Sequence, residues 1–232
     1  MKAIPQSKSV LVVTGAAFEA RIAAGDGIVV VSSGGDPARL RDSLAALDAS
    51  RFRAVISFGL AGGLDPALRP GHLFLASHVK ASAETWYATL RLTGALASAL
   101  RAKRTTLQAV AGVDEPVMDP AGKAAVRTAT GFSVVDMETH IAARYAHASN
   151  LPWGALRVVC DPAERVLPPL ALKALKPDGG IHYAAILKSL VADPGQIPEL
   201  IAIARDTVRA VRALRRARRR LGAGFGLGAA DL

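Results

Sequence analysis

The stretch FSVVDMETHIAARYAHASNLPWGALRVVCDP, residues 132–162, decides the fold, because apolar strand patterns enclose a helical one. The first apolar segment ends at the acid Glu138, and a helical run over residues 139–148 follows. The second apolar segment ends at Asp161, and Pro162 prevents that strand from continuing. The stretch therefore predicts a buried strand, a helix and a second buried strand, with an acid at the end of each strand.

The two strand-end acids indicate a ligand site. In an open α/β sheet, ligands collect in the crevice outside the carboxyl ends of the strands, so Glu138 and Asp161 could grip a hydroxyl or exchange a proton there. The alternative is that each acid caps a helix, the usual role of an acid at this place. The segment AVISFGLAGGLD, residues 54–65, favours the pocket. It predicts a strand that ends in a turn with three glycines, which let a ligand approach the main chain.

Strand and helix patterns alternate along the rest of the chain. We expect further strands over residues 10–14, 27–32, 54–58, 72–77, 85–92 and 105–112. We expect helices over residues 16–24, 38–47, 93–101, 120–128, 183–192 and 198–221, with Asp36, Thr93 and Asp119 as caps. Only residues 222–230, rich in glycine and alanine, are predicted to be disordered. This alternation predicts a three-layer α/β domain in which helices flank a central mixed, largely parallel sheet.

Composition narrows the functional classes. The chain has 232 residues, 51% of them hydrophobic and 21% charged, which is typical of one globular core. No apolar run reaches the length of a membrane-spanning helix, and residues 10–13 are too short for a signal peptide. The single Cys160 cannot form an internal disulfide, so we expect a reducing cytosol. No cysteine and histidine spacing matches a metal site, and we expect no metal.

Most of the positive charge lies in one predicted helix. Residues 205–220 hold eight arginines and one acid, a net charge of +7 out of +10 for the whole chain. Apolar residues recur there at steps of three and four, which predicts an amphipathic helix. Its stripe could pack on the core and leave a solvated basic face, or the arginines Arg205–Arg220 could bind an anionic membrane. We do not expect nucleic-acid binding, because no aromatic side chain lies among the arginines.

Three motifs together resemble those of the purine nucleoside phosphorylase and methylthioadenosine/S-adenosylhomocysteine nucleosidase superfamily. They are FGLAGGL at 58–64 with Pro70-Gly71 after it, VDME at 135–138 and VCDPA at 159–163. Their order and intervals fit over roughly residues 9–190. Four further short segments resemble segments of the hopanoid-biosynthesis-associated phosphorylases of this superfamily: VVTG at 12–15, SGGD at 33–36, VDMETH at 135–140 and PGQIP at 194–198.

The resemblance implies roles for the strand-end residues. Cleavage of an N-glycosidic bond leaves negative charge on the departing purine, and Asp161 matches the acid that donates to purine N7, which requires a raised pKa. Glu138 matches the residue that grips the ribose hydroxyls, and Met137 would pack beneath the sugar. Further substrate contacts are expected at Ala61, Gly62 and Val117, and those to the base would be aliphatic or backbone, because no aromatic occurs near Val117.

The attacking group is left open between water and phosphate. Glu19 is the acid available to activate water, although its register differs by one position from the family's base. Arg21 offers a cation for phosphate, or it is a solvated helix residue. Ser33, Gly34 and Ser77 complete the expected phosphate or water contacts, Ser77 standing next to Ala76, where the family usually has a serine. No cofactor is expected beyond inorganic phosphate as a co-substrate.

The resemblance also implies an organisation and a substrate. Residues 1–192 would form the catalytic domain, and residues 193–232 a basic helix and tail that either belong to it or face a membrane. The expected reaction is release of adenine from adenosylhopane, a lipid-linked nucleoside. The alternatives are a nucleosidase for a soluble adenosine derivative and a non-catalytic nucleoside-binding protein. We expect a homo-oligomer in the cytoplasm, peripheral on the inner face of the membrane.

Overall fold

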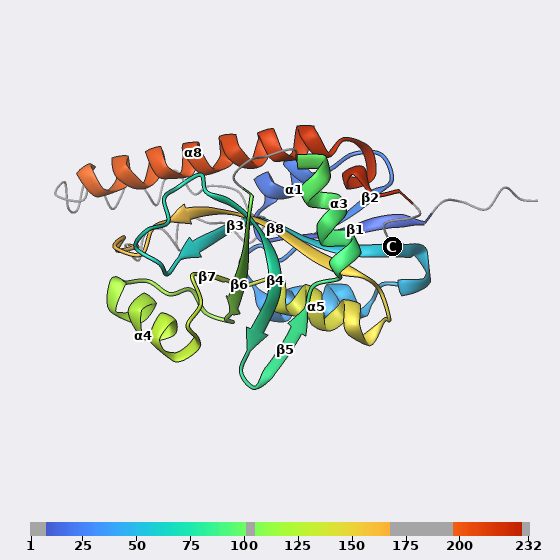
Figure 1. The fold of residues 1–232 in the computed structure, drawn as a ribbon, viewed down its shortest axis with the longest axis horizontal. Helices are drawn as coiled ribbons and strands as arrows, with labels where there is room; N and C mark the ends of the chain where they lie inside the picture. The colour runs from blue at the N-terminus through green and yellow to red at the C-terminus, as the bar shows by residue number, and fades with distance from the viewer. Residues whose placement is uncertain (1–7, 101–104, 168–196, 229–232) are drawn as a thin grey trace, which may run out of the picture.

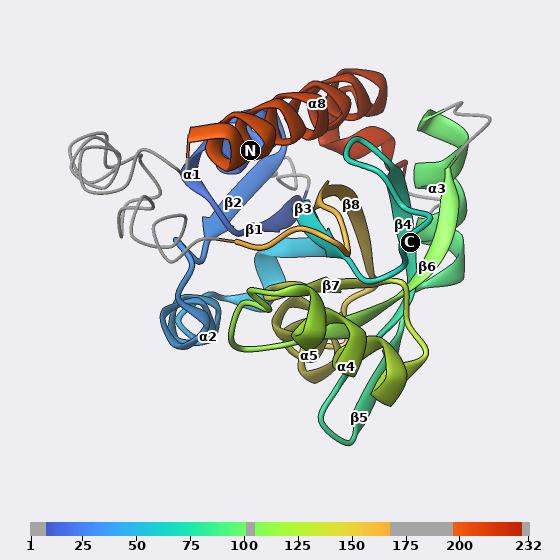
Figure 2. The same ribbon diagram turned by 90° about the vertical axis from the view of Figure 1, so that its left-hand side faces the viewer.

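The computed structural model describes residues 8–100, 105–167 and 197–228 of the chain. Its strands are β1 Ser9–Thr14, β2 Ile28–Ser32, β3 Phe52–Gly63, β4 Leu73–Ala81, β5 Glu84–Tyr87, β6 Thr106–Gly112, β7 Val134–Asp136 and β8 Trp153–Asp161. Its helices are α1 Ala17–Ala23, α2 Pro37–Ala45, α3 Leu90–Leu100, α4 Pro120–Thr130, α5 Thr139–Ala148 and α8 Ile197–Leu221, with short 3₁₀ turns η1 Ala49–Arg51 and η3 Ala223–Gly226. Helices lie on both sides of the central sheet (Figures 1 and 2).

The described strands form one mixed sheet in the order β2-β1-β3-β7-β6-β4-β5, with β8 paired to both β3 and β4. Through β8 the five strands β3, β8, β4, β6 and β7 close into a ring. Neighbours run parallel except in the pairs β3–β7, β4–β8 and β4–β5. The predicted fold class, a mixed and largely parallel sheet flanked by helices, is confirmed.

Two hydrophobic cores lie on opposite faces of the sheet, because successive side chains of a strand point to opposite faces. In β1, Val10 and Val12 pack with α1, α3 and α8, whereas Leu11 and Val13 pack with α2 and α5. The uninterrupted apolar run at residues 10–13 thus serves both cores, which is typical of a strand covered on both sides.

Two helices begin at the predicted caps. Asp36 accepts hydrogen bonds from the backbone N–H groups of Ala38 and Arg39, and Pro37 is the first residue of α2. Asp119 accepts from the backbone N–H of Gly122 at the start of α4. These side chains satisfy N–H groups that have no partner within the helix.

The glycine-rich segment after residue 58 is not a turn, so that prediction was wrong. β3 continues to Gly63, and the glycines allow side chains to cross it closely. A Cβ on Gly59 would lie 2.7 Å from Arg157 Nη1 and from Glu19 Oε1, and a Cβ on Gly62 would lie 3.0 Å from Val135 Cγ1. The glycines therefore serve close approach rather than chain reversal.

The strand predicted over residues 85–92 is shorter, and the helix after it starts earlier. β5 ends at Tyr87 and α3 begins at Leu90, so Thr93 is a buried residue inside the helix and not its cap. Leu92, Leu96 and Leu100 bury one face of α3 on the sheet, and this packing extends the helix beyond the expected start. The helix expected over residues 183–192 lies outside the described residues.

The α8 helix and the segment after it pack on the sheet, so the prediction of disorder was wrong for residues 222–228. Phe225 is fully buried, and its ring meets that of Phe58 edge to face at 5.3 Å. The Arg218 guanidinium lies over the Phe225 ring at 5.0 Å from its centroid and donates to the carbonyl of Ala23. Within the described ranges, no helix is long and apolar enough to span a bilayer.

Candidate active site

A cavity of about 340 Å³ opens where β1, β3 and β8 end, between the start of α5 and the first half of α8. The residues that line it come from seven separate parts of the chain. They are Gly15, Ala16, Phe18, Glu19, Gly34, Gly35, Leu60, Ala61, Gly62, Val113, Pro116, Val117, Val135, Asp136, Met137, Glu138, Cys160, Asp161, Arg165, Leu167, Ile203, Asp206 and Thr207. The place agrees with the rule that ligands bind outside the carboxyl ends of strands.

Glu138 directs its carboxylate to a hydrogen-bond network and not to the helix that it precedes. β7 ends at Asp136, two residues earlier than predicted, and Glu138 occupies the cap position of α5 without a capping bond. Asp136 does the capping, since its Oδ1 accepts from the N–H of Thr139 at 3.1 Å. Glu138 Oε1 instead accepts from the Ser33 hydroxyl at 3.1 Å. The capping alternative therefore fails for Glu138.

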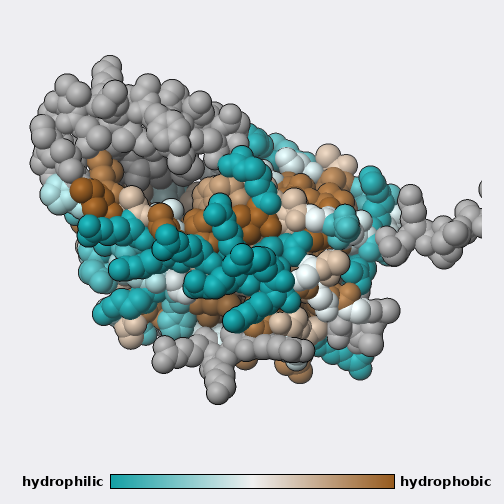
Figure 3. Space-filling view, turned by 90° about the horizontal axis from the view of Figure 1, so that it is seen from above, coloured by the Kyte–Doolittle hydropathy of each residue, from teal (hydrophilic) through white to brown (hydrophobic). Residues whose placement is uncertain are grey.

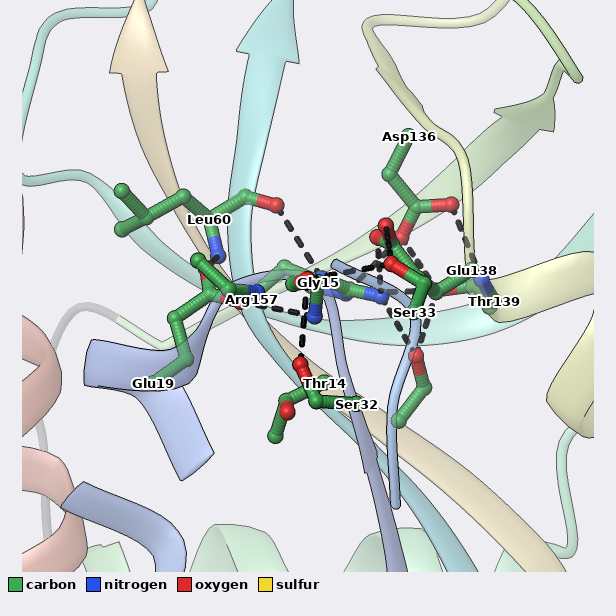
Figure 4. Close-up of polar contacts among 12 residues, drawn as sticks. Thr14, Gly15, Glu19, Ser32, Ser33, Leu60, Asp136, Glu138, Thr139 and Arg157 are labelled. Atoms are coloured by element: carbon green, nitrogen blue, oxygen red, sulfur yellow. Dashed lines mark hydrogen bonds and ion pairs between the residues drawn. The ribbon is translucent and has the colours of Figure 1, made fainter. Parts of the chain in front are cut away.

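Arg157 is the centre of this network, as Figure 4 shows. The side chain is fully buried, and its Nε lies 2.8 Å from Asp136 Oδ2. Its Nη2 donates to Glu138 Oε2 at 3.2 Å and to the Ser57 hydroxyl at 2.7 Å. Our sequence prediction missed this residue, although an arginine inside an apolar strand is a signal, because a buried charge needs partners.

The Arg157 guanidinium lies among three buried acids, Asp136, Glu138 and Glu19. Burial raises the pKa of Glu138 to about 7, and the charges of Asp136 and Glu19 add to the rise while Arg157 opposes it. Burial also raises the pKa of Glu19, against the Arg157 charge and the backbone N–H groups that it accepts from. Both carboxyl groups therefore keep a proton to higher pH than exposed acids do.

Glu19 reaches the cavity from the first turn of α1. Its Oε2 accepts from the N–H groups of Gly15 and Ala16, each at 2.8 Å, and its Oε1 accepts from the N–H of Leu60 at 2.7 Å. Gly15 separates the two acids, since a Cβ there would lie 2.8 Å from Glu138 Oε1 and 3.2 Å from Glu19 Oε2. Glu19 and Glu138 thus form one acidic wall of the cavity.

Asp161 has one paired and one unpaired carboxylate oxygen. Its Oδ2 lies 2.8 Å from the ammonium of Lys123, a fully buried group that also donates to the carbonyls of Pro162 and Arg165. Among the described residues, the buried Oδ1 of Asp161 has no hydrogen-bond partner. Burial raises the pKa of Asp161, and the Lys123 bond opposes this. An unpaired buried oxygen is costly, so a ligand atom that bonds to it is favoured.

Most of the candidate residues meet at the cavity. Eight of them line it: Glu19, Gly34, Ala61, Gly62, Val117, Met137, Glu138 and Asp161. Ser33 lies behind this lining, where its hydroxyl bonds Glu138 and its oxygen accepts from the N–H of Gly35. It therefore orients the carboxylate rather than facing the cavity.

Two candidates lie elsewhere. Arg21 is exposed on α1. It follows Glu19 by two residues, which rotates it by about 200° around the helix, away from the cavity that Glu19 lines. Ser77 lies on β4, which contributes nothing to the lining, and its hydroxyl contacts His78 Nδ1 at 3.1 Å. The structure does not support either residue as a phosphate or water contact.

The cavity also contains groups that carried no sequence signal. Phe18 lines it, although only aliphatic and backbone contacts to the base were expected. Asp206, the acid of the arginine-rich helix, is buried and lies 2.7 Å from Arg165 Nη2. Arg165 also pairs with Glu199 at 3.2 Å, so α8 closes one side of the cavity through an ion-pair cluster. Among the described residues, no group of three metal-ligating side chains occurs.

Comparison with known proteins gives one family and many structural relatives. The family model described as the phosphorylase superfamily matches residues 4–174. The fold is similar to S-adenosylhomocysteine nucleosidase from Streptococcus pyogenes (TM-score 0.64, 14% identity, 93% of this chain and 97% of that chain). It is also similar to futalosine hydrolase from Helicobacter pylori (TM-score 0.62, 16% identity, 80% and 98%). No curated protein matches the sequence.

Proposed function

Because the chain belongs to the phosphorylase superfamily, we propose that it cleaves the N-glycosidic bond between a purine base and ribose. The observation that carries the proposal is Asp161 Oδ1, a buried acceptor without a described partner in a cavity that also holds Glu138 and Glu19. A carboxyl group with one oxygen paired to Lys123 and the other unpaired can form a hydrogen bond with one atom of a ligand. The neighbours named above are nucleosidases or hydrolases of nucleosides, which agrees with this class of reaction.

Asp161 would assist the departure of the base. As the glycosidic bond breaks, negative charge builds on the purine, and a proton or hydrogen bond at N7 stabilises it. The raised pKa of Asp161 favours the protonated form that this role needs. Lys123 lies 2.8 Å from the other oxygen, and this ion pair holds the carboxyl group in place at the cavity.

Glu138 would bind the ribose. Its carboxylate is held by Ser33 on one oxygen and by Arg157 on the other, and each oxygen has a further lone pair for a hydroxyl. Hydrogen bonds to an ionised acceptor are among the stronger ones, so a pair of hydroxyl groups would be well held. Met137 lines the cavity next to Glu138, where it can pack against the sugar.

We favour water as the attacking group, because burial raises the pKa of Glu19 and so makes its carboxylate a stronger proton acceptor. Three backbone N–H groups fix this carboxylate, which suits a base that must keep its position. Inorganic phosphate remains the alternative co-substrate. A phosphate dianion would have to enter beside Glu19, whose negative charge repels it.

We propose that the substrate carries an apolar group at the 5′ carbon of the ribose, as adenosylhopane does. Away from the acids, the lining is mostly apolar: Phe18, Leu60, Val113, Pro116, Val117, Leu167 and Ile203. Such a surface favours an alkyl substituent over a charged one. The second candidate, a soluble derivative such as S-adenosylhomocysteine, rests on the name of the Streptococcus pyogenes neighbour. A purely binding protein would not need an acid at purine N7.

A series of 5′-alkylthio adenosines tests the apolar substituent. Each buried methylene is worth about 0.8 kcal/mol, so kcat/KM should rise about fourfold per methylene from methyl to hexyl. Adenine release, followed by chromatography, gives the rates. S-adenosylhomocysteine, with its charged substituent, is the comparison substrate. A flat series, or a faster reaction with S-adenosylhomocysteine, would favour the soluble alternative.

The remaining implications of the resemblance stay predictions: a homo-oligomer, a cytoplasmic location, and residues 1–192 as the catalytic domain. The proposed chemistry uses protons and the attacking water or phosphate alone, so it needs no metal or organic cofactor.

A further inference from the structure

The α8 helix has two distinct faces. Its inner face is packed on the sheet through Ala210, Ala213, Leu214, Ala217 and Leu221. In its first half the same helix lines the cavity with Ile203, Asp206 and Thr207. Its outer face carries seven exposed arginines: Arg205, Arg209, Arg212, Arg215, Arg216, Arg219 and Arg220. Figure 3 shows hydrophilic side chains in a band over this side of the molecule.

The arginines form a continuous stripe. Steps of four, three, four and three residues join Arg205, Arg209, Arg212, Arg216 and Arg219, which keeps them on one side of the helix. The 25 residues of α8 span about 37 Å. The stripe is therefore long and straight.

Few of these charges are neutralised by the residues that the structure describes. Among the described residues, Arg209 lies 3.4 Å from Asp206, and Arg220 donates to the carbonyl of Leu100. No described partner is found for Arg205, Arg212, Arg215, Arg216 and Arg219. The acids Glu199 and Asp206 of the same helix pair with Arg165 instead. Within the described ranges, the outer face thus keeps a strong positive charge.

Large apolar side chains accompany the charges. Ile201 and Val208 are each 46% exposed and follow the same side of α8 as the arginines, and Val166 is 49% exposed. Basic residues with exposed apolar side chains between them fit the headgroup region of a bilayer. A surface that binds single-stranded nucleic acid usually carries aromatic side chains on which bases stack, and α8 contains none.

We propose that the outer face of α8 binds the surface of a membrane rich in anionic lipids. The helix lies flat on that surface, because its apolar stripe is already used in the core, and attraction between charges supplies most of the binding. Each basic residue close to such a surface strengthens adsorption about fivefold. Seven arginines are more than enough to hold the protein there reversibly.

The cavity lies close to the basic face of α8, so membrane binding through this face would bring the cavity near the bilayer. One helix forms both the wall of the cavity and the basic face, so a bound membrane lies one helix diameter from the cavity. A substrate with a lipid chain could then pass between bilayer and cavity without crossing water. This use rests on the proposed function, whereas adsorption itself does not, and vesicle binding is measured without substrate.

Flotation with vesicles tests the proposal on the full-length chain. Vesicles of phosphatidylglycerol and phosphatidylcholine should carry the protein at 0.1 M salt, whereas pure phosphatidylcholine should not. Binding should be lost in 1 M salt, where the Debye length falls from about 10 Å to about 3 Å. Changing Arg205, Arg212, Arg216 and Arg219 to glutamine should weaken binding at least about a hundredfold. The matched control changes four exposed basic residues of other elements to glutamine: Lys8, Arg51, Lys80 and Arg91.

The outcomes separate the membrane proposal from its rivals. Loss of flotation in the α8 variant but not in the control supports it, and both variants should unfold at the wild-type temperature, which shows that the fold is kept without any assay of activity. Equal loss in both variants means that net charge alone binds the vesicles, and the proposal is wrong. It is also wrong if wild type does not float at 0.1 M salt, or if it prefers a DNA duplex to anionic vesicles at equal charge.

Discussion

Changing Asp161 to asparagine should reduce adenine release by about 10²- to 10⁴-fold, the usual effect of losing a general acid. The amide cannot deliver a proton to purine N7. The fold should be retained, because the asparagine carbonyl can still accept from Lys123, whose ammonium also keeps the carbonyls of Pro162 and Arg165. Single-turnover release of adenine measures the effect, and thermal unfolding checks the fold.

The matched control for this variant is Asp26→Asn, which removes an exposed carboxylate far from the lining residues. It should leave the rate unchanged. If Asp161→Asn turned over within threefold of wild type, Asp161 would have no part in the chemistry and the departing base would need another acid.

Changing Glu138 to glutamine should lower kcat/KM for ribonucleosides by about 10- to 150-fold, which corresponds to one charge-assisted hydrogen bond of about 1.5–3 kcal/mol. The network can adapt, since the new amide can donate to Ser33 while its oxygen accepts from Arg157. The loss should be much smaller for 2′-deoxynucleosides, which wild type should use poorly. The ratio of ribo- to deoxyribonucleoside rates is the measurement.

The pH dependence of that ratio gives a second readout. The pKa of Glu138 is raised to about 7, so its carboxylate is charged above this pH and protonated below it. The preference for ribose should therefore weaken as the pH falls through about 7. The control Glu115→Gln, at an exposed carboxylate, should keep the wild-type ratio. Equal use of ribo- and deoxyribonucleosides by wild type would show that Glu138 does not bind the ribose.

The sequence predicted the structure correctly where the local pattern of residues and the motifs agree. Asp36 and Asp119 identified helix starts, and the strand-end acids Glu138 and Asp161 identified the place of the cavity. Glu19 was also found from its motif. The helix caps bond to backbone groups only two or three residues away, and the place of the two acids follows from where their strands end.

Other parts of the site depend on contacts between distant segments, which periodicity does not encode. Lys123 lies in α4 and reaches Asp161 only because α4 folds over the end of β8. The glycines of β3 suggested a turn, but their role is to admit Arg157 and Glu19 from neighbouring elements. Arg21 and Ser77 were candidates from their places in the sequence, yet Arg21 lies on the exposed side of α1 and Ser77 on β4, which does not line the cavity.

The arginine helix illustrates the same limit. Its amphipathic pattern predicted α8 well but left open what its apolar side contacts. The structure places that side in the core, together with Phe225. Removing the helix would therefore damage the fold, and the role of its charged face must be tested by substitution rather than by deletion.

Incubating the purified full-length protein with adenosylhopane, with and without phosphate, tests the central claim most directly. We predict that free adenine is released in both conditions and that the product is the free ribosyl lipid, because Glu19 activates water. A product formed only with phosphate and carrying it on the sugar would make phosphate the attacking group. Failure to release adenine from adenosylhopane and from any soluble adenosine derivative would contradict the assignment of this cavity to N-glycosidic cleavage.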